Sequence, residues 1–261
     1  MTPLAWPGRR LIRLAGRAGR HGAFLGAAVS GMLSGGFRGR DVVYQIRAIG
    51  AGSVPVIVLA GGFVGMVVAL QFHDTLVRFG SESLIGSAVG LSLIRELGPV
   101  ITALMVIGRS GSTMCAELAV MRTEQQMDAL TCMAIDPLPF LVTPRFIATL
   151  VAVPLLTAIM VFVGIFGGWF IAHMLFGVGT GTYFQGMAET VNHRDLAMGL
   201  IKSLVFALVI VWISTARGFL IHLDRRGRFG AAGISAVTTE AVVYAAVAVL
   251  FSDYLVSSLL R

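Results

Sequence analysis

Charged side chains that interrupt otherwise apolar stretches are the residues of this chain best suited to do chemistry. Arg95 and Glu96 are adjacent near the middle of one apolar stretch, whereas Lys202 and Asp253 each lie toward the outer end of another. A charged group in lipid is costly unless it pairs or meets water, so such residues point to a functional site. We predict that Arg95 and Glu96 line a pore or cavity. The alternative is an internal ion pair that only fixes helix packing.

Lys202 allows two interpretations. It lies about six residues, or roughly 9 Å, inside its apolar stretch, so its ammonium could extend outward to the membrane surface. It could instead meet the anionic headgroup of a lipid. Asp253 lies at a similar depth and is its simplest partner.

A bend is predicted beside the first charged pair. Pro99 has no N–H, so the carbonyl of Arg95 loses its helical partner and the helix should kink there. Gly98 precedes the proline and adds flexibility. We therefore expect Gly98 and Pro99 to act as a hinge.

Other kinds of chemistry find little support in the sequence. The five histidines are scattered, no Ser/His/Asp triad is apparent, and Cys115 and Cys132 lack the spacing of metal ligands. Lys202 is the only lysine and follows Leu200 and Ile201, so the chain has no Walker A loop. We expect no catalytic residue, metal or cofactor in this chain. Any ATP and magnesium would be bound by a partner ATPase.

The composition places these residues in a membrane protein. Hydrophobic residues make up 56% of the 261 residues, and only 13% are charged, whereas soluble domains carry about a quarter charged residues. About 20 apolar residues cross the hydrocarbon core. Stretches of that length occur at 50–72, 84–108, about 146–175, 196–216 and about 236–258. We predict an all-α integral membrane protein with five transmembrane helices.

The arginines set the orientation. With a cytoplasmic N-terminus, the cytoplasmic segments 1–49, 109–145 and 217–235 carry 15 of the 20 Lys and Arg residues, and the outer segments carry three. Positive charge collects on the cytoplasmic side, so the C-terminus is expected outside, in the periplasm. The net charge of +7 therefore reflects topology rather than nucleic-acid binding.

The first 47 residues form a basic segment. Arg9, Arg13, Arg17 and Arg20 recur at helical spacing with apolar residues between them, which is typical of an amphipathic helix on an anionic membrane face. A signal peptide is the alternative, but arginines interrupt its start. We assign 1–47 to an interfacial region and 48–261 to one transmembrane domain.

The loop 109–145 has helical patterning of its own. Residues 108–112 predict a turn that enters a helix, Thr123 and Gln126 have capping-box spacing, and Asp136-Pro137 predicts a stop. A short cytoplasmic helix here suits a docking surface for a soluble partner. The alternative is a helix that lies on its own bundle.

Small residues recur four positions apart in two spans. Gly61 and Gly65 share the first span, and Gly164 and Gly168 share the third. This spacing favours close contact between helices in lipid.

Several motifs together resemble the MlaE family, the permease subunits of bacterial phospholipid ABC transporters that work with MCE proteins. The resemblance covers nearly the whole chain after residue 40. It rests on Gly65-Met66, Leu70-Gln71, Arg95-Glu96-Leu97-Gly98-Pro99, Gly108-Arg109-Ser110-Gly111-Ser112, Ala116-Glu117-Leu118, Met121-Arg122, Asp128-Ala129-Leu130, Asp136-Pro137, Pro144-Arg145, Lys202-Ser203, Phe206, Gly233, Thr238-Thr239, Ala241-Val242-Val243 and Asp253.

The resemblance implies a homodimer in the bacterial inner membrane that moves phospholipid and maintains outer-membrane lipid asymmetry. It implies a cytoplasmic ABC ATPase of the MlaF type, a periplasmic MCE protein of the MlaD type and a STAS-domain subunit of the MlaB type. Gln71, Arg95, Glu96, Lys202 and Asp253 would lie in or near the lipid path, and Val68 and Leu76 would meet the acyl chains.

The resemblance also places a coupling helix, which contacts the ATPase, within 121–136. Its candidate contacts are Arg122, Glu124, Gln125, Gln126, Asp128 and Asp136. Two other functions stay open: a secondary transporter or channel that uses Glu96 and Lys202 for proton or ion coupling, and a membrane anchor for the MCE protein.

Overall fold

The computed structural model describes residues 19, 22–31, 39–223 and 230–260, and these residues form helices and short connections without strands. The helix bounds are Gly22–Gly31, α2 Gly39–Ile49, α3 Val54–Val77, α4 Ile85–Ser92, α5 Gly98–Val106, α6 Ser112–Thr123, α7 Gln126–Cys132, α8 Thr143–Met174, α9 Thr180–Thr190, α10 His193–Phe219 and α11 Ala231–Leu259. The basic helix predicted around Arg9 to Arg20 lies outside the described residues, apart from position 19.

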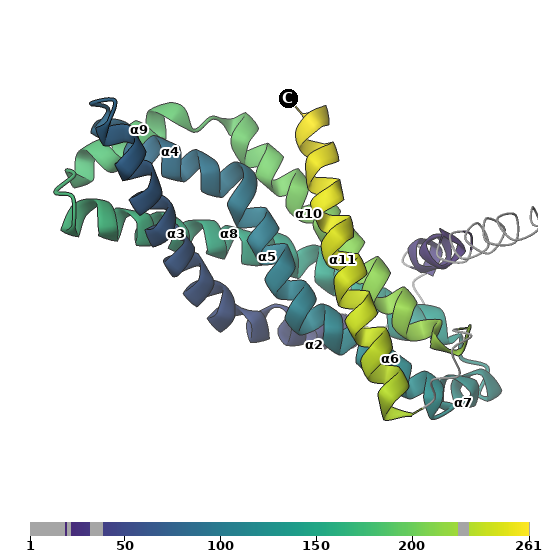
Figure 1. Cartoon of the computed structure of the whole chain (residues 1–261). Coiled ribbons are helices and arrows are strands. Elements are labelled where there is room, and N and C mark those ends of the chain that lie inside the picture. Colours follow the sequence, from purple (N-terminus) through teal and green to yellow (C-terminus); the bar gives the residue numbers. More distant parts are fainter. Residues whose placement is uncertain (1–18, 20–21, 32–38, 224–229, 261) are drawn as a thin grey trace, which may run out of the picture.

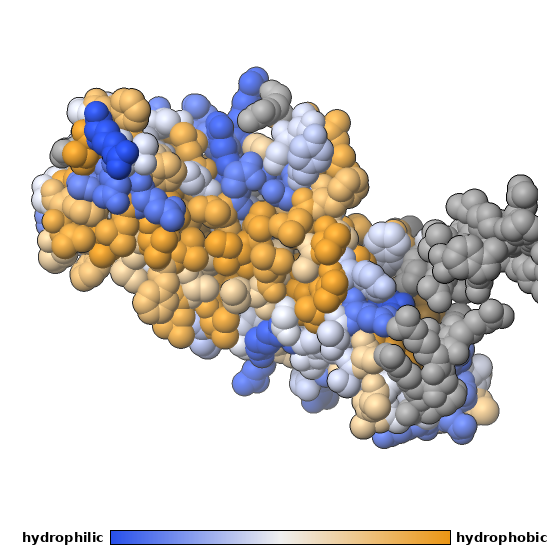
Figure 2. Space-filling view, in the orientation of Figure 1, coloured by the Kyte–Doolittle hydropathy of each residue, from blue (hydrophilic) through white to orange (hydrophobic). Residues whose placement is uncertain are grey.

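Five candidate membrane spans occur within the described residues, as predicted. Their bounds are Gly39–Val77, Ile85–Thr123, Leu138–Met174, His193–Phe219 and Ala231–Leu259. Figure 2 shows the corresponding surface: hydrophobic residues gather in a band across the middle of the visible face, and hydrophilic residues lie toward both ends. The chain is therefore an all-α membrane protein.

The second span contains two π-helical segments, at Leu93–Leu97 and Ile107–Gly111. The first ends at Leu97, two residues before Pro99, and the N–H of Gly98 bonds to the carbonyl of Leu93, five residues back. Figure 1 shows the chain changing direction between α4 and α5. A proline that removes a backbone donor and a wider helical turn together account for this bend. A hinge motion at Gly98 and Pro99 stays a prediction.

The turn predicted at 108–112 is wrong, because the second span continues as helix to Thr123. The hydroxyl of Ser112 donates to the carbonyl of Gly108 at 2.5 Å and that of Thr113 to the carbonyl of Arg109 at 2.8 Å. Arg109 also donates to the carbonyl of Ala48. These bonds satisfy polar groups within a helical backbone, so the Gly- and Ser-rich sequence does not form a turn.

The capping box and the stop predicted around α7 are also wrong. The Thr123 hydroxyl donates to the carbonyl of Ala119, so the predicted capping box with Gln126 is absent. α7 instead begins after Gln125, whose backbone is left-handed at φ 59°. The helix ends at Cys132, before the predicted stop at Asp136-Pro137.

The predicted glycine contacts are confirmed where α3 packs on α8. A Cβ added at Gly61 would lie 2.9 Å from the Met160 carbonyl oxygen, and one at Gly65 would overlap the carbonyl of Gly164. Glycine at these positions lets the two backbones approach closely, as small residues do between helices in lipid.

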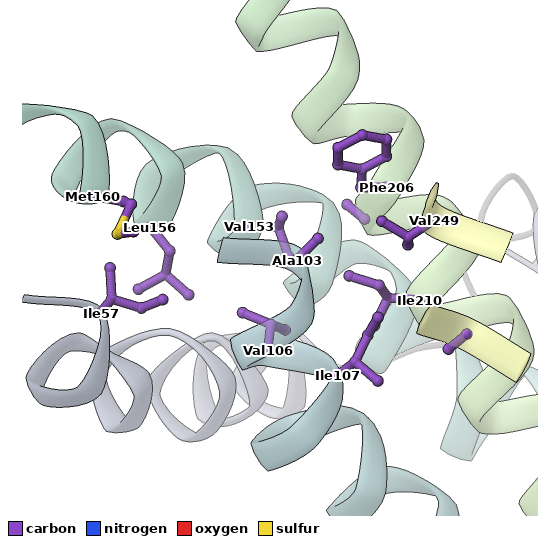
Figure 3. Packing of buried hydrophobic residues seen from close by; sticks show 12 residues of the cluster. Ile57, Ala103, Val106, Ile107, Val153, Leu156, Met160, Phe206, Ile210 and Val249 are labelled. Carbon is purple, nitrogen blue, oxygen red and sulfur yellow. The ribbon is translucent and has the colours of Figure 1, made fainter. Parts of the chain in front are cut away.

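A hydrophobic core joins these helices to the rest of the bundle. Figure 3 shows Ile57 from α3 facing Leu156 and Met160 from α8, with Ile210 from α10 near Ile107. All five side chains are at most 2% exposed. This packing holds α3, α5, α8 and α10 together.

Candidate functional site

Lys202 lies between two carboxylates contributed by different helices. Its Nζ is 2.5 Å from Oε2 of Glu96 in the π-helical segment and 2.8 Å from Oδ1 of Asp253 in α11. The lysine side chain is fully buried, whereas the Glu96 side chain is 47% exposed. The pairing of Lys202 with Asp253, predicted from their matching depth, is confirmed. Glu96 completes the group, with the Ser257 hydroxyl 3.4 Å from its Oε1.

Arg95 forms a second ion pair, with Asp195 near the start of α10. Nε of Arg95 donates to Oδ1 of Asp195 at 2.7 Å, and Nη2 lies 2.5 Å from the same oxygen. Arg95 and Glu96 therefore do not pair with each other. Each meets a partner on α10, and the two pairs tie the bend of the second span to the fourth span.

Asp195 is a site residue that the sequence interpretation missed. Its Oδ2 accepts from the backbone N–H of Asn192, and the Asn192 side chain accepts a backbone bond in return, so the two residues form a capping box. The spacing of Asn192 and Asp195 is visible in the sequence and would have indicated the start of α10. Pairing with Arg95 is a tertiary contact that this local spacing does not encode.

A cavity of about 1060 Å³ lies beside both ion pairs. The charged residues of its lining are Arg95, Glu96, Arg194 and Asp195, and its apolar lining residues include Leu91, Met198, Ile201 and Leu260. The cavity is thus bounded by the α4–α5 bend, the start of α10 and the end of α11. It lies toward the end of the bundle that holds the C-terminus, opposite α7 (Figure 1). A cavity with charged groups beside apolar walls suits an amphipathic ligand.

The predicted path residues divide into two groups. Arg95 and Glu96 line the cavity. Lys202 and Asp253 are not among its lining residues: Lys202 pairs with Glu96, and Asp253 pairs with Lys202. The three others lie on α3, away from this cavity: Gln71, Val68 and Leu76. Val68 is buried among α3, α4 and α8 side chains, Leu76 packs against that cluster, and Gln71 is exposed. The role of these three in lipid contact stays a prediction.

The predicted coupling residues gather at the opposite end, around α6 and α7. Arg122 lies 2.9 Å from Asp128 and donates to Nδ1 of His222 at 3.2 Å, while Gln126 donates to Glu124. Partial burial, followed by the positive charge of Arg122, lowers the pKa of His222. The ring therefore accepts from Arg122 as a neutral imidazole at neutral pH.

The two remaining coupling candidates have backbone roles. Gln125 holds the left-handed turn between α6 and α7, and Asp136 accepts from the N–H of Leu138 at 3.0 Å. Each shapes the connection at one end of α7. Contact with an ATPase stays a prediction for all six residues.

Ion pairs also fix this end of the bundle, and the sequence interpretation did not predict them. Arg145 at the start of α8 is buried and pairs with Glu117 of α6 at 2.8 Å. Arg217 of α10 pairs with Glu240 of α11. Each pair joins two different spans, so the cytoplasmic end predicted from charge is cross-linked by salt bridges.

Comparison with known proteins gives a consistent family. The family model described as "Permease MlaE" matches residues 42–259. The intermembrane phospholipid transport system permease protein MlaE of Haemophilus influenzae is 36% identical over 84% of this chain and 82% of its own length.

Relatives in other organisms have similar identity. A probable ABC transporter permease protein of Rickettsia felis is 36% identical over 97% of this chain and 95% of its own length. The chloroplastic protein TRIGALACTOSYLDIACYLGLYCEROL 1 of Arabidopsis thaliana is 34% identical over 89% of this chain and 65% of its own length. With its five spans, its charged cavity and these matches, the chain belongs to the MlaE permease family.

Proposed function

We propose that this chain is the permease subunit of an ABC transporter that moves phospholipid between the bacterial inner membrane and a periplasmic MCE protein, maintaining outer-membrane lipid asymmetry. The named function of the Haemophilus relative supports this proposal. ATP and magnesium bind to a partner ATPase of the MlaF type. The N-terminus faces the cytoplasm and the C-terminus the periplasm, in keeping with the arginine distribution.

The observation that carries the proposal is the cavity beside the bend of the second span. Arg95 and Glu96 offer charged groups of both signs, and each side chain is about half exposed. Leu91, Ile201 and Leu260 supply apolar surface in the same cavity. A phospholipid headgroup needs the charged groups, and the start of its acyl chains needs the apolar surface.

Transport requires the cavity to respond to the ATPase. The chain acts as a homodimer on two ATPase subunits, with an MlaB-type STAS subunit beside them and an MlaD-type MCE protein at the opposite end. Closure of the ATPase reaches the cavity through the coupling stretch 121–136 and the helix that runs from it to the bend at Gly98 and Pro99. That helix is continuous from α4 to α6, so displacement at one end can move the other.

Lipid transfer by the reconstituted complex tests this assignment. Glu96→Ala is expected to lower ATP-driven phospholipid transfer by about tenfold, the order expected for one lost charge-assisted hydrogen bond. Glu189→Ala is the matched control, because Glu189 is exposed on α9 and does not line the cavity. Equal transfer by the Glu96→Ala complex and the native complex would remove Glu96 from the mechanism.

A second candidate function is ion- or proton-coupled transport. The observation in its favour is Lys202, a fully buried cation between two carboxylates, since such groups mark proton and ion pathways in membranes. Purification in mild detergent separates the candidates. The ABC proposal expects an ATPase to accompany the tagged chain and transfer to require ATP. Transfer driven by an ion gradient without an ATPase would favour the second function.

A further inference from the structure

The cavity contains a cation that pairs with no carboxylate among the residues that the structure describes. Arg194, at the start of α10, lines the cavity and is exposed. Among ion pairs between residues that the structure describes, Arg95 is held by Asp195 and Lys202 by Glu96 and Asp253, and none involves Arg194. Arg194 is thus the cavity cation available to an incoming anion.

The charges at the cavity balance only when Arg194 is included. Arg95 and Lys202 pair with three carboxylates, so the five side chains of these ion pairs together carry an excess negative charge. A ligand of net negative charge would be repelled by that excess. A ligand with an anionic group near Arg194 and a cationic group near Glu96 would complement both the positive charge of Arg194 and the excess negative charge of the ion pairs.

The two charged groups of such a ligand have distinct partners. A phosphate accepts paired hydrogen bonds from a guanidinium, and the cavity is lined by the guanidinium-bearing Arg194, which is exposed, and Arg95, which is about half exposed. A cation would meet Glu96, whose carboxylate is about half exposed. The hydroxyls of Ser257 and Ser258 line the same part of α11 and can accept from N–H donors.

The lining also distinguishes between kinds of cation. Quaternary ammonium groups are bound by several aromatic faces, but Tyr254 is the single aromatic residue in the lining of this cavity as the structure describes it. A primary ammonium donates hydrogen bonds, and the acceptors here are a carboxylate and hydroxyls. The lining therefore suits a primary ammonium.

We propose that this cavity selects phospholipids whose headgroup is a phosphate joined to a primary amine, as in phosphatidylethanolamine, with Arg194 holding the phosphate and Glu96 the ammonium. The inference rests on the proposed function and specifies its substrate. It makes Arg194, which no motif singled out, the residue that binds the phosphate, and Glu96 the residue that determines the headgroup preference.

Competitive lipid binding to the full chain in detergent tests the selection. Native mass spectrometry would measure retention of phosphatidylethanolamine, phosphatidylcholine and phosphatidylglycerol with identical acyl chains. We expect phosphatidylethanolamine to be preferred by about tenfold over each of the others, which is the effect of one charge-assisted hydrogen bond. Binding of either competitor at parity would overturn the proposal.

Two variants assign the preference to its residues. Arg194 is exposed, so the Arg194→Gln chain is expected to fold. The substitution is expected to weaken binding of all three lipids about equally, because all three carry the phosphate. Glu96→Gln is expected to remove the preference for the amine. The controls Arg78→Gln and Glu189→Gln change exposed residues outside the cavity. Unchanged lipid retention by Arg194→Gln would overturn its assignment to the phosphate.

The outcomes also separate this inference from the function beneath it. Failure of the complex to bind or transfer any phospholipid contradicts the proposed function. Phospholipid binding and ATP-driven transfer without a headgroup preference leave that function in place and overturn only the headgroup selection.

Discussion

Replacement of Lys202 by methionine is expected to lower the free energy of unfolding by about 3 kcal/mol, because removing one partner of a buried ion pair leaves uncompensated charge. Two carboxylates, on the second and fifth spans, depend on the same ammonium. Glu96 is half exposed, so the estimate takes the lower end of the usual range. Thermal or denaturant unfolding of the purified chain in detergent would measure the change.

A triple variant provides the control for this prediction. Neutralising both carboxylates together with the lysine, as Lys202→Met with Glu96→Gln and Asp253→Asn, removes the charges that the single variant leaves behind. Stability is expected to return to within about 1 kcal/mol of the native chain, since replacing an entire buried ion group is often close to neutral. Native stability of the Lys202→Met chain itself would show that the ammonium does not hold these helices together.

Substitution of Gly65 by alanine is expected to separate α3 from α8 and lower the free energy of unfolding by about 2 kcal/mol, as overpacking does. The added Cβ would overlap the carbonyl group of Gly164. The position of the Cβ is fixed by the backbone of α3, and the carbonyl belongs to the backbone of α8, so neither group can rotate away. Unfolding in detergent is again the measurement.

Gly62 gives a matched control on the same helix. A Cβ at Gly62 would lie 3.8 Å from Cγ1 of Val163, an ordinary van der Waals contact. Gly62→Ala is therefore expected to leave stability unchanged or to raise it slightly, because alanine is the better helix former. Equal destabilisation by both variants would contradict the close approach of α3 to α8 at Gly65.

The sequence predicts the spans because lipid imposes a length and a composition on each of them. The same physical cost makes charged residues within spans conspicuous, and the depth of Lys202 and Asp253 was enough to pair them. The depth of the charged residues does not indicate that Asp195 is the partner of Arg95. That contact depends on how the bend at Pro99 turns the second span toward α10, which is a property of the packed bundle.

The errors lie where local signals conflict with tertiary contacts. Residues 108–112 have the composition of a turn, but hydroxyls that bond back to the helix and the anchored Arg109 keep them helical. Likewise, Thr123 bonds within its own helix instead of capping the next. Short polar residues offer the backbone alternatives, and the surrounding structure decides between them.

A structure of the complex in a lipid bilayer, prepared with phospholipid carrying a heavy-atom label on its headgroup, tests the central claim most directly. We expect headgroup density within hydrogen-bond distance of Arg95 and Glu96, in the cavity between the bend of the second span, α10 and α11. A labelled headgroup bound elsewhere, with that cavity filled only by water, would contradict it.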